Sequence, residues 1–272
     1  MISVFDRLRA VSTVIIVLIG AGLSSPRPLL AEDDLAESWV IEKEQWAADP
    51  GVVESVKVRN DFGDLRVRQS EDGQVHLLAS IQRHQEDPRR AEIGHRETGS
   101  EMGIEVRYRG TGTSEPDEER DSWKRRRVDV TLLIPTEVEL VAETKRGLIE
   151  AKGMKNRIDV RSEWGDVVVS SHGSITALSE RGDIDVKFES ARWSGSARLE
   201  TLTGSISVLL PADPDVLVKM ETRGQLATDF TLEVAHQPNT TLKTGTAVIG
   251  EATAELYLRS DRGNLSLRRL GR

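Results

Sequence analysis

Residues 175–186 read Ile-Thr-Ala-Leu-Ser-Glu-Arg-Gly-Asp-Ile-Asp-Val, and this stretch decides the fold. Apolar side chains stand at alternate positions before Gly182 and after it, as strands with one buried face require. A glycine between two such runs is typical of a tight turn that a side chain would obstruct. The stretch therefore predicts a strand, a turn at Gly182 and a second strand.

The same template occurs seven times along the chain. An aliphatic residue follows each turn glycine by two positions, and a small Ser, Thr or Asn precedes it by three positions in six of the seven units. From the second to the sixth glycine the steps are 18, 17, 22 and 20 residues, which leaves room for two strands and two corners but no helix. The turn glycines are Gly63, Gly147, Gly165, Gly182, Gly204, Gly224 and Gly263.

Two all-β architectures fit this repeat. In a solenoid of the β-helix or β-roll kind, with about 17–22 residues per coil, each coil stacks on the preceding one and buries an aliphatic column. Strands at half this spacing also suit a β-sandwich. The near-constant step and the low aromatic content of 4% favour the solenoid, because its core consists of thin aliphatic layers. Gly153, Gly173, Gly195 and Gly245 are expected at the second corners.

The chain divides into three segments. Residues 1–31 are expected to be a signal peptide, because Arg7 and Arg9 precede an apolar run at 10–23 that is shorter than the roughly 20 residues of a membrane span. Residues 32–51 are expected to be a lead-in that caps the first coil, and residues 52–272 form the repeat domain. A charged loop near 110–127 interrupts it and is expected to be solvated. These features predict export to the periplasm, the cell envelope or the exterior.

Three motifs carry a resemblance to a known family. They are Arg-Gly-Asp-Ile-Asp-Val at 181–186, Leu-Thr-Gly-Ser-Ile-Ser-Val at 202–208 and Ser-Asp-Arg-Gly-Asn-Leu-Ser-Leu at 260–267. In this ordered series the chain resembles the bacterial DUF4097 domains, also called a "putative adhesin" family and related to the GIN-type adhesin heads. The resemblance covers most of residues 52–270. It implies a right-handed β-helix-like fold and export, and it assigns no functional residue.

Several function classes are disfavoured by composition and by missing motifs. The net charge of −8 argues against a nucleic-acid partner, whose phosphates require a basic surface. The chain has no cysteine, so it has no disulfide and no thiolate ligand or nucleophile. It also lacks nucleophile-elbow, zinc-protease, phosphate-loop and dinucleotide motifs. The sequence therefore predicts no catalytic residue, no cofactor and no metal site.

The Gly-Asp pairs at residues 63–64, 165–166 and 182–183 raise the question of calcium. Calcium β-rolls repeat at half the interval seen here and place two glycines before the aspartate. Aspartates that accept hydrogen bonds from turn amides explain the pairs more simply.

The residues immediately before the turn glycines suggest a binding surface. If the coils stack, these side chains form a column that could hold an acidic glycan by forked hydrogen bonds and by stacking. Flanking acids offer an alternative, a ladder of exposed ion pairs, and the sequence favours it because such pairs are common. The column residues are Arg146, Trp164, Arg181, Thr203, Arg223 and Arg262, and the flanking acids are Glu163, Asp166, Glu180, Asp183 and Asp261.

The sequence as a whole predicts a non-enzymatic, exported envelope protein that acts as an adhesin or as a structural, surface-presenting module. Its partner is expected to be an envelope glycan or another envelope protein, with membrane contact only through an uncleaved signal segment. A ligand-binding or envelope-stress-sensing accessory module is the alternative. A polysaccharide-active β-helix enzyme is a third reading, which paired carboxylates on one concave strand face would support.

Overall fold

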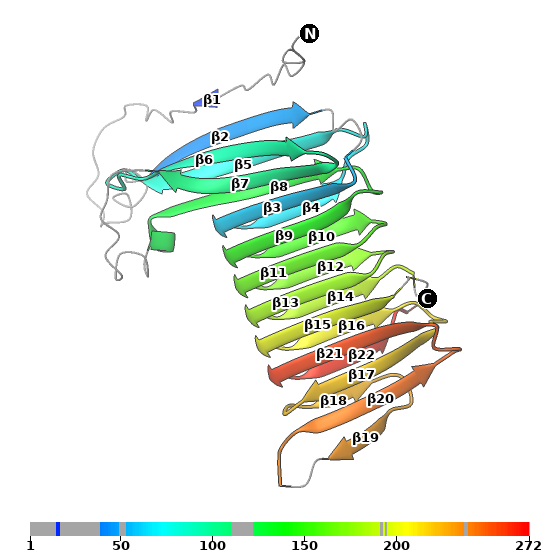
Figure 1. The fold of residues 1–272 in the computed structure, drawn as a ribbon. Helices are drawn as coiled ribbons and strands as arrows, with labels where there is room; N and C mark the ends of the chain where they lie inside the picture. The colour runs from blue at the N-terminus through cyan, green and yellow to red at the C-terminus, as the bar shows by residue number, and fades with distance from the viewer. Residues whose placement is uncertain are drawn as a thin grey trace, which may run out of the picture.

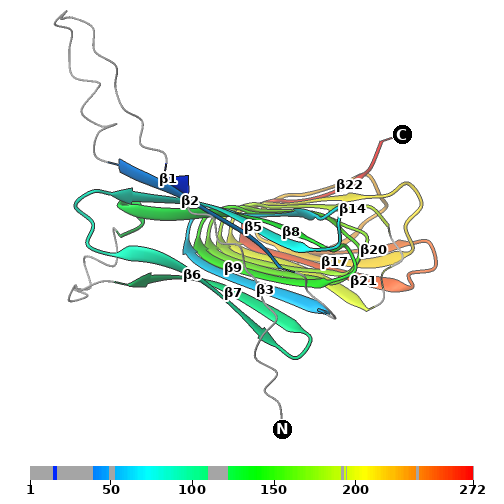
Figure 2. The same cartoon turned by 90° about the horizontal axis from the view of Figure 1, so that it is seen from above.

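The computed structural model describes residues 15–16, 39–48, 53–109, 122–190, 193, 195–236 and 239–271. The described chain is all-β and consists of two mixed sheets of eleven strands each, with one short 3-10 element, η2 (Ser122–Lys124). Figure 1 shows the strands stacked in a column, and Figure 2 shows the two sheets as layers seen from above. Within the described part, no helix is long and apolar enough to cross a membrane.

Four successive strand pairs form the middle of the stack. In each pair the first strand lies in one sheet, here called sheet B, and the second lies in the other, sheet A. Neighbouring strands within each sheet are parallel, so that Val160 pairs with Ala142 on one side and with Ala177 on the other. The pairs are β9 (Glu139–Arg146) and β10 (Ile149–Met154), β11 (Ile158–Trp164) and β12 (Val167–Ser171), β13 (Ile175–Arg181) and β14 (Ile184–Phe188), and β15 (Ser196–Thr203) and β16 (Ile206–Leu210).

The core lies between the two sheets and is mainly aliphatic. The alternating residues predicted to point inward are buried, for instance Val160 of β11 at 2% exposed and Val167 of β12 at 0%, except that Leu226 and Thr228 are only partly buried. Parallel register places the same position of each strand pair next to its counterpart in the neighbouring pair, so the buried side chains form continuous columns. Phe188 stacks on the ring of Trp193 at 4.3 Å and supplies the main aromatic contact of this core.

The turn glycines are required because consecutive turns lie in direct backbone contact. A Cβ added to Gly165 would lie 2.0 Å from the carbonyl oxygen of Gly147, and one added to Gly182 would lie 2.1 Å from that of Gly165. The small residues three positions earlier bond the same carbonyls, as the sequence suggested. Ser179 Oγ donates to Gly165 O at 3.2 Å, and Thr201 Oγ1 donates to Gly182 O at 3.1 Å.

The stack does not follow chain order at its C-terminal end. The pair β21 (Ala254–Arg262) and β22 (Leu265–Arg269) lies between β15–β16 and the earlier pair β17 (Val216–Thr222) and β18 (Leu226–Thr228). Consistently, Gly263 stacks on Gly204, and Gly224 stacks on Gly263. The expectation that every coil stacks on the preceding one is therefore wrong here, because the apolar pattern of β21 fits either neighbour.

Gly245 does not form a second corner, contrary to expectation. It lies inside β20 (Lys243–Ile249), which runs antiparallel to β17 and to β19 (Glu233–His236). The side chain of Leu232 packs over it, and its Cδ1 would lie 3.0 Å from an added Cβ. The glycine therefore makes room for a neighbouring side chain.

The N-terminal end is also out of chain order. The coil β3 (Ser55–Phe62) and β4 (Leu65–Gln69) lies between β9–β10 and a layer that contains β7 (Glu101–Arg109) and β8 (Arg126–Ile134). Beyond that layer, β6 (Arg90–Thr98) pairs with β7, and β5 (Val75–His84) pairs with β8, both antiparallel. The expected lead-in forms β2 (Trp39–Ala48), which pairs with β5.

Two sequence assignments at this end are resolved only in part. The expected loop at 110–127 ends earlier than predicted, because Arg126 and Arg127 already belong to β8. Residues 110–121 lie outside the described residues, as does most of the expected signal segment. From that segment, Ile15–Ile16 forms β1, antiparallel to β2.

Gly165→Ala should destabilise the fold by at least about 3 kcal/mol, because the new methyl group overlaps the backbone of the preceding turn. Denaturant unfolding measures the difference. Gly103→Ala is the control, because a Cβ there meets its nearest atom at 3.7 Å. Equal stability of the two variants would contradict the close stacking of the turns.

Candidate functional site: the turn edge

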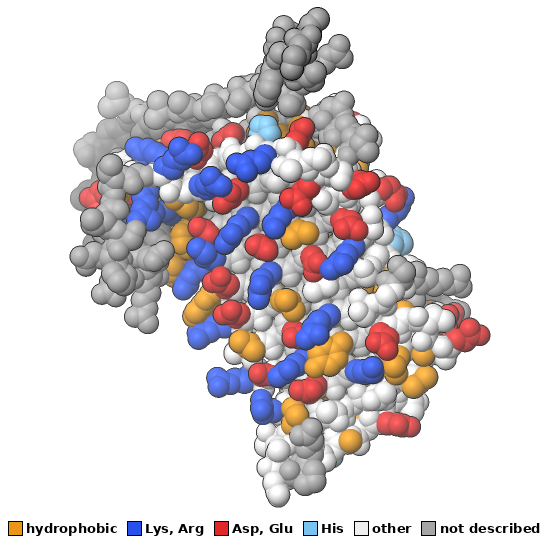
Figure 3. Space-filling model, in the orientation of Figure 1, with side chains coloured by type: hydrophobic (Ala, Val, Ile, Leu, Met, Phe, Trp, Pro, Cys, Tyr) orange, Lys and Arg blue, Asp and Glu red, His pale blue; other side chains and the backbone are white. Residues whose placement is uncertain are grey.

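The strands of sheet B end at an edge where the residues before the turn glycines form a column, here called the edge column. Backbone register places Phe62, Arg146, Trp164, Arg181, Thr203 and Arg262 in that order. Neighbouring strands lie about 4.8 Å apart, so Arg146 and Arg262 are separated by about 19 Å. In Figure 3 basic and hydrophobic side chains follow one another along the edge where β9, β11, β13 and β15 end.

Arginines and tryptophans alternate at the end of the edge column that lies nearer the N-terminal layers, which is its upper end in Figure 1. The guanidinium carbon of Arg181 lies 4.0 Å from the centre of the Trp164 ring, and that of Arg146 lies 4.5 Å from the same ring. Arg146 also lies 5.1 Å from the ring of Trp123, in η2. Cation–π contacts of this kind hold the planar guanidinium groups in place and leave their N–H edges able to bind. Both indoles are exposed, Trp123 at 40% and Trp164 at 39%.

The ion-pair ladder favoured by the sequence is wrong. Within the described part of the chain, none of Arg146, Arg181, Arg223 and Arg262 forms an ion pair. The nearby acids are used elsewhere. Asp261 pairs with Arg259 at 3.2 Å. Asp166 accepts a hydrogen bond from Asp183 N at 2.9 Å, and Asp183 accepts one from Ser205 N at 2.7 Å.

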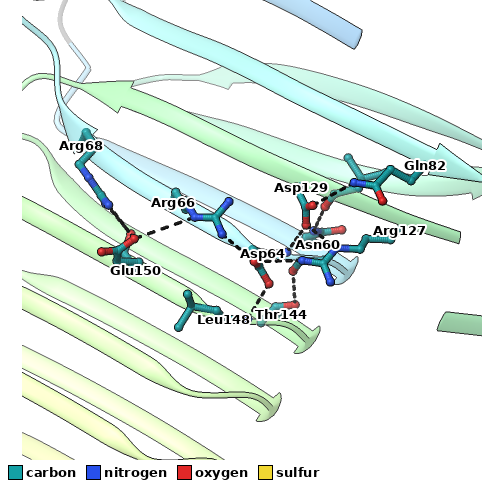
Figure 4. Close-up of polar contacts among 12 residues, drawn as sticks. Asn60, Asp64, Arg66, Arg68, Gln82, Arg127, Asp129, Thr144, Leu148 and Glu150 are labelled. Carbon is teal, nitrogen blue, oxygen red and sulfur yellow. Dashed lines mark hydrogen bonds and ion pairs between the residues drawn. The ribbon is translucent and has the colours of Figure 1, made fainter. Parts of the chain in front are cut away.

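The same use of aspartate continues toward the N-terminus, as Figure 4 shows. Asp64 accepts a hydrogen bond from Leu148 N at 3.1 Å and pairs with Arg66 at 2.9 Å and Arg127 at 3.0 Å. In the neighbouring layer, Asp129 of β8 accepts a hydrogen bond from Asp64 N at 2.9 Å. The Gly-Asp pairs therefore serve to join consecutive turns, which is the role expected of turn aspartates.

A pocket of about 400 Å³ opens at the upper end of the edge column. Its aromatic walls are Phe62, Tyr108 and Trp164, and the Phe62 and Tyr108 rings lie 5.7 Å apart. Burial, followed by the negative charge of Asp61, raises the pKa of Tyr108, so its hydroxyl stays protonated. The charged lining consists of Arg89, Arg126, Lys145 and Arg146 with Asp61 and Glu163. With Asp87, the buried partner of Arg126, also counted, four cations face three acids, and this positive excess together with the aromatic walls makes the edge pocket suited to an anion with an apolar face.

A buried ion pair supports one wall of the edge pocket. The Arg126 side chain is 9% exposed, and its Nε donates to Asp87 Oδ2, which is fully buried, at 2.7 Å. The Arg126 guanidinium also lies 5.6 Å from the centre of the Tyr108 ring. Arg83 Nη1 donates to the backbone oxygen of Asp87 at 3.2 Å and fixes that loop. The pair thus connects the loop before β6 to the start of β8.

The structure brings together part of the predicted edge surface. Arg146, Trp164 and Arg181 are in contact, whereas Arg262 lies two strands beyond Arg181, and Arg223 lies one strand further still because of the altered coil order. Sequence reasoning missed Trp123, because it placed the whole stretch near 110–127 in a solvated loop. An exposed tryptophan in so charged a segment was the available signal.

The histidines are scattered. His76 contacts Asp72, His84 lies against the Trp39 ring, and His95 lies against the Trp46 ring. Among the described residues, no three His, Asp or Glu side chains gather in a way that could hold a metal ion.

Comparison with known proteins identifies similar structures only. No family model matches the chain, and no curated protein matches it. A structure from Clostridium sporogenes described as a "putative cell adhesion protein" has 12% identity and a TM-score of 0.44, covering 85% of this chain and all of that one. A structure from Bacteroides fragilis described as a "putative adhesin" has 12% identity and a TM-score of 0.31, covering 84% of this chain and 97% of that one. Another structure described as a "putative adhesin", from Parabacteroides distasonis, has 9% identity and a TM-score of 0.28, covering 85% of this chain and 97% of that one. Because these TM-scores are low, the function is argued from the side chains of this chain and not from these structures.

Asp87→Ala should cost about 3–5 kcal/mol, because it leaves the Arg126 guanidinium buried without its partner. The double variant Asp87→Leu with Arg126→Met should cost less, since it removes both charges. Urea unfolding of the two variants gives the comparison. A larger loss in the double variant would show that the pair itself contributes net stability.

Asp185 should make stability depend on pH. Burial, and then repulsion from Asp183 and Asp166, raise the pKa of its carboxyl above the ordinary value. The Asp185 carboxyl therefore binds its proton more tightly in the folded state than in the unfolded state. The ionised carboxylate lowers the free energy of unfolding, and this loss of stability disappears as pH falls through the raised pKa. Asp185→Asn should melt at a higher temperature than the parent at pH 7, and the gap should close in acid.

The opposite sign is expected at Glu150, which serves as the matched control. Hydrogen bonds from Lys152 and then Arg68 lower the pKa of the Glu150 carboxyl. Its stabilising effect is present above the ordinary pKa and is lost as pH falls through the lowered value. Glu150→Gln should therefore melt below the parent at pH 7 and approach it in acid. Parallel pH profiles for the two variants would contradict both assignments.

Proposed function

We propose that this protein is an exported, non-enzymatic β-solenoid of the cell envelope that binds an acidic polymer along its edge column. The alternating stack of Trp123, Arg146, Trp164 and Arg181 is the single observation that carries the proposal. Its indoles are exposed, and its guanidinium groups form no ion pair with the described residues. An acidic glycan offers both apolar ring faces and carboxylates, which match indoles and guanidinium forks respectively.

The β-solenoid assignment is supported by the parallel pairing of successive coils. Strands of one coil alternate between the two sheets, and each turn glycine from Gly147 onward lies against the turn of the neighbouring coil, whereas Gly63 lies against Val128 of β8. Such winding repeats one side-chain position at a fixed spacing along an edge. A repeating polymer is the kind of ligand that a repeating edge can bind at several points.

Binding rather than catalysis fits the way carboxylates are used around the edge column. Asp64, Asp166 and Asp183 accept hydrogen bonds from the backbone of adjacent turns, so they serve the fold. Asp61, in the edge pocket, is paired with Lys145 at 3.1 Å. This arrangement supports an adhesive or surface-presenting role, whereas the enzymatic alternative would require a carboxylate pair to act on the polymer.

Arg146→Ser combined with Arg181→Ser should weaken binding of the full chain to oligogalacturonate at least about tenfold, or about 1.4 kcal/mol. Titration calorimetry measures the affinity, and an assay for new reducing ends detects cleavage. Arg157→Ser combined with Arg268→Ser removes the same charge from exposed positions away from the edge and should leave affinity nearly unchanged. Equal binding by both double variants would refute the edge column as the site, and release of reducing ends would refute the non-enzymatic role.

A further inference from the structure

A second depression, of about 370 Å³, lies on the outer face of sheet B near its N-terminal end. Strands β6, β7 and β3 form its floor, and Gly94 of β6 and Gly103 of β7 lie in it. Figure 3 shows this part of the face as rows of basic side chains interspersed with acidic ones. At these two positions the floor is bare backbone, because glycine has no side chain.

The fold does not require these two glycines. A Cβ on Gly103 would have its nearest neighbour, Arg96 O, at 3.7 Å, and one on Gly94 would have Glu105 O at 4.0 Å. Neither glycine has a positive φ. This contrasts with the turn glycines, where an added Cβ would overlap backbone. Glycine weakens a strand interior and often marks a place where a ligand approaches the backbone closely.

Three of the cations that line the depression form no ion pair with the described residues. Register places Lys57 and Arg96 directly across from Gly103, on its two neighbouring strands, and places Arg59 across from Glu105. All three cations are exposed, and within the described residues none of them forms an ion pair. An anion that binds over Gly103 therefore lies between the positive charges of Lys57 and Arg96.

The wider lining is also positive, although the whole chain carries a charge of −8. Arg107 and Arg109 are paired with Glu105 and Glu92 respectively. The lining thus holds five cations, Lys57, Arg59, Arg96, Arg107 and Arg109, against three acids, Glu92, Glu101 and Glu105, which leaves a formal charge of +2. The hydrogen bond from Arg107, with the fields of Arg59 and Arg96, lowers the pKa of Glu105 and keeps it ionised.

The depression is connected to the edge column by shared lining residues. Arg59 lines both the depression and a smaller hollow that also contains Lys145 and Glu163. Lys145 and Glu163 in turn line the edge pocket beside Trp164. One extended ligand can therefore contact both sites without leaving the surface.

We propose that the depression over Gly94 and Gly103 is a second binding site, which holds one uronic-acid-type pyranose of an acidic glycan. The sugar ring lies over the bare backbone of the two glycines, and its carboxylate lies between Lys57 and Arg96. This inference rests on the proposed function for the class of polymer, and it adds a site and a requirement for a carboxylate on the bound sugar.

Gly103→Thr is the decisive variant, because it fills the depression without removing a charge. It should melt at or above the temperature of the parent, since threonine favours strands, and it should bind oligogalacturonate at least about tenfold more weakly. Lys57→Gln combined with Arg96→Gln should produce a similar loss and serves as the second variant if Gly103→Thr does not fold. Parent affinity in both variants would overturn the second site.

The ligand series identifies the chemistry of the bound group. The full chain should bind oligogalacturonate more tightly than its methyl ester, which keeps the rings and loses the charges. Inorganic phosphate should bind weakly and should not compete. Equal binding of the ester, or competition by phosphate, would overturn the assignment to a uronate.

Comparison with the edge variants separates the two proposals. If Arg146→Ser with Arg181→Ser weakens binding, and neither Gly103→Thr nor Lys57→Gln with Arg96→Gln does, the second site is wrong and the edge column stands. If only Gly103→Thr weakens binding, the edge column is wrong and the depression is the binding site.

Discussion

Backbone contact between consecutive turns is the constraint on which the structure depends. At each of these turns the glycine lies so close to a backbone carbonyl of the neighbouring layer that a methyl group would overlap it by more than 1 Å relative to ordinary contact; this carbonyl belongs to the neighbouring turn glycine, or to Val128 of β8 in the case of Gly63. A hydroxyl or amide three residues earlier donates to this carbonyl, for instance Ser260 Oγ to Gly204 O at 2.7 Å, and before Gly224 the donor is Thr222, two residues earlier. Both devices keep neighbouring coils in register, because a shift of one residue would bring a side chain into the contact and turn apolar residues outward.

This fixed register converts a sequence position into a surface. Residues that precede the turn glycines are far apart in the chain, yet they lie at the strand spacing along one edge. The neighbouring Asp166 and Asp183 accept hydrogen bonds from backbone amides of the next turn, and they form no ion pair with the arginines of the edge column. The fold thus determines both where the basic and aromatic groups of the edge column gather and why their charges remain available.

The two kinds of glycine in this chain have different consequences. Gly165 and its equivalents permit close turns, and their loss would damage the fold. Gly94 and Gly103 have room for a side chain. Because glycine has none, a depression remains at these positions, and Lys57 and Arg96 border it. Stability therefore explains the first set, whereas the second set is better explained by contact with a ligand.

The sequence by itself determined the strands, the buried positions and the turns, because period-two alternation around a glycine is a local property of each unit. It also indicated that Arg146, Trp164 and Arg181 would align. Only the tertiary structure decided that β21–β22 enters between earlier coils, since each unit carries the same apolar pattern and fits several neighbours. It likewise decided that Trp123 joins the edge column and that Arg126 is buried against Asp87, because these contacts join segments 23 and 39 residues apart (146 − 123 and 126 − 87) and depend on long-range packing that no local pattern encodes.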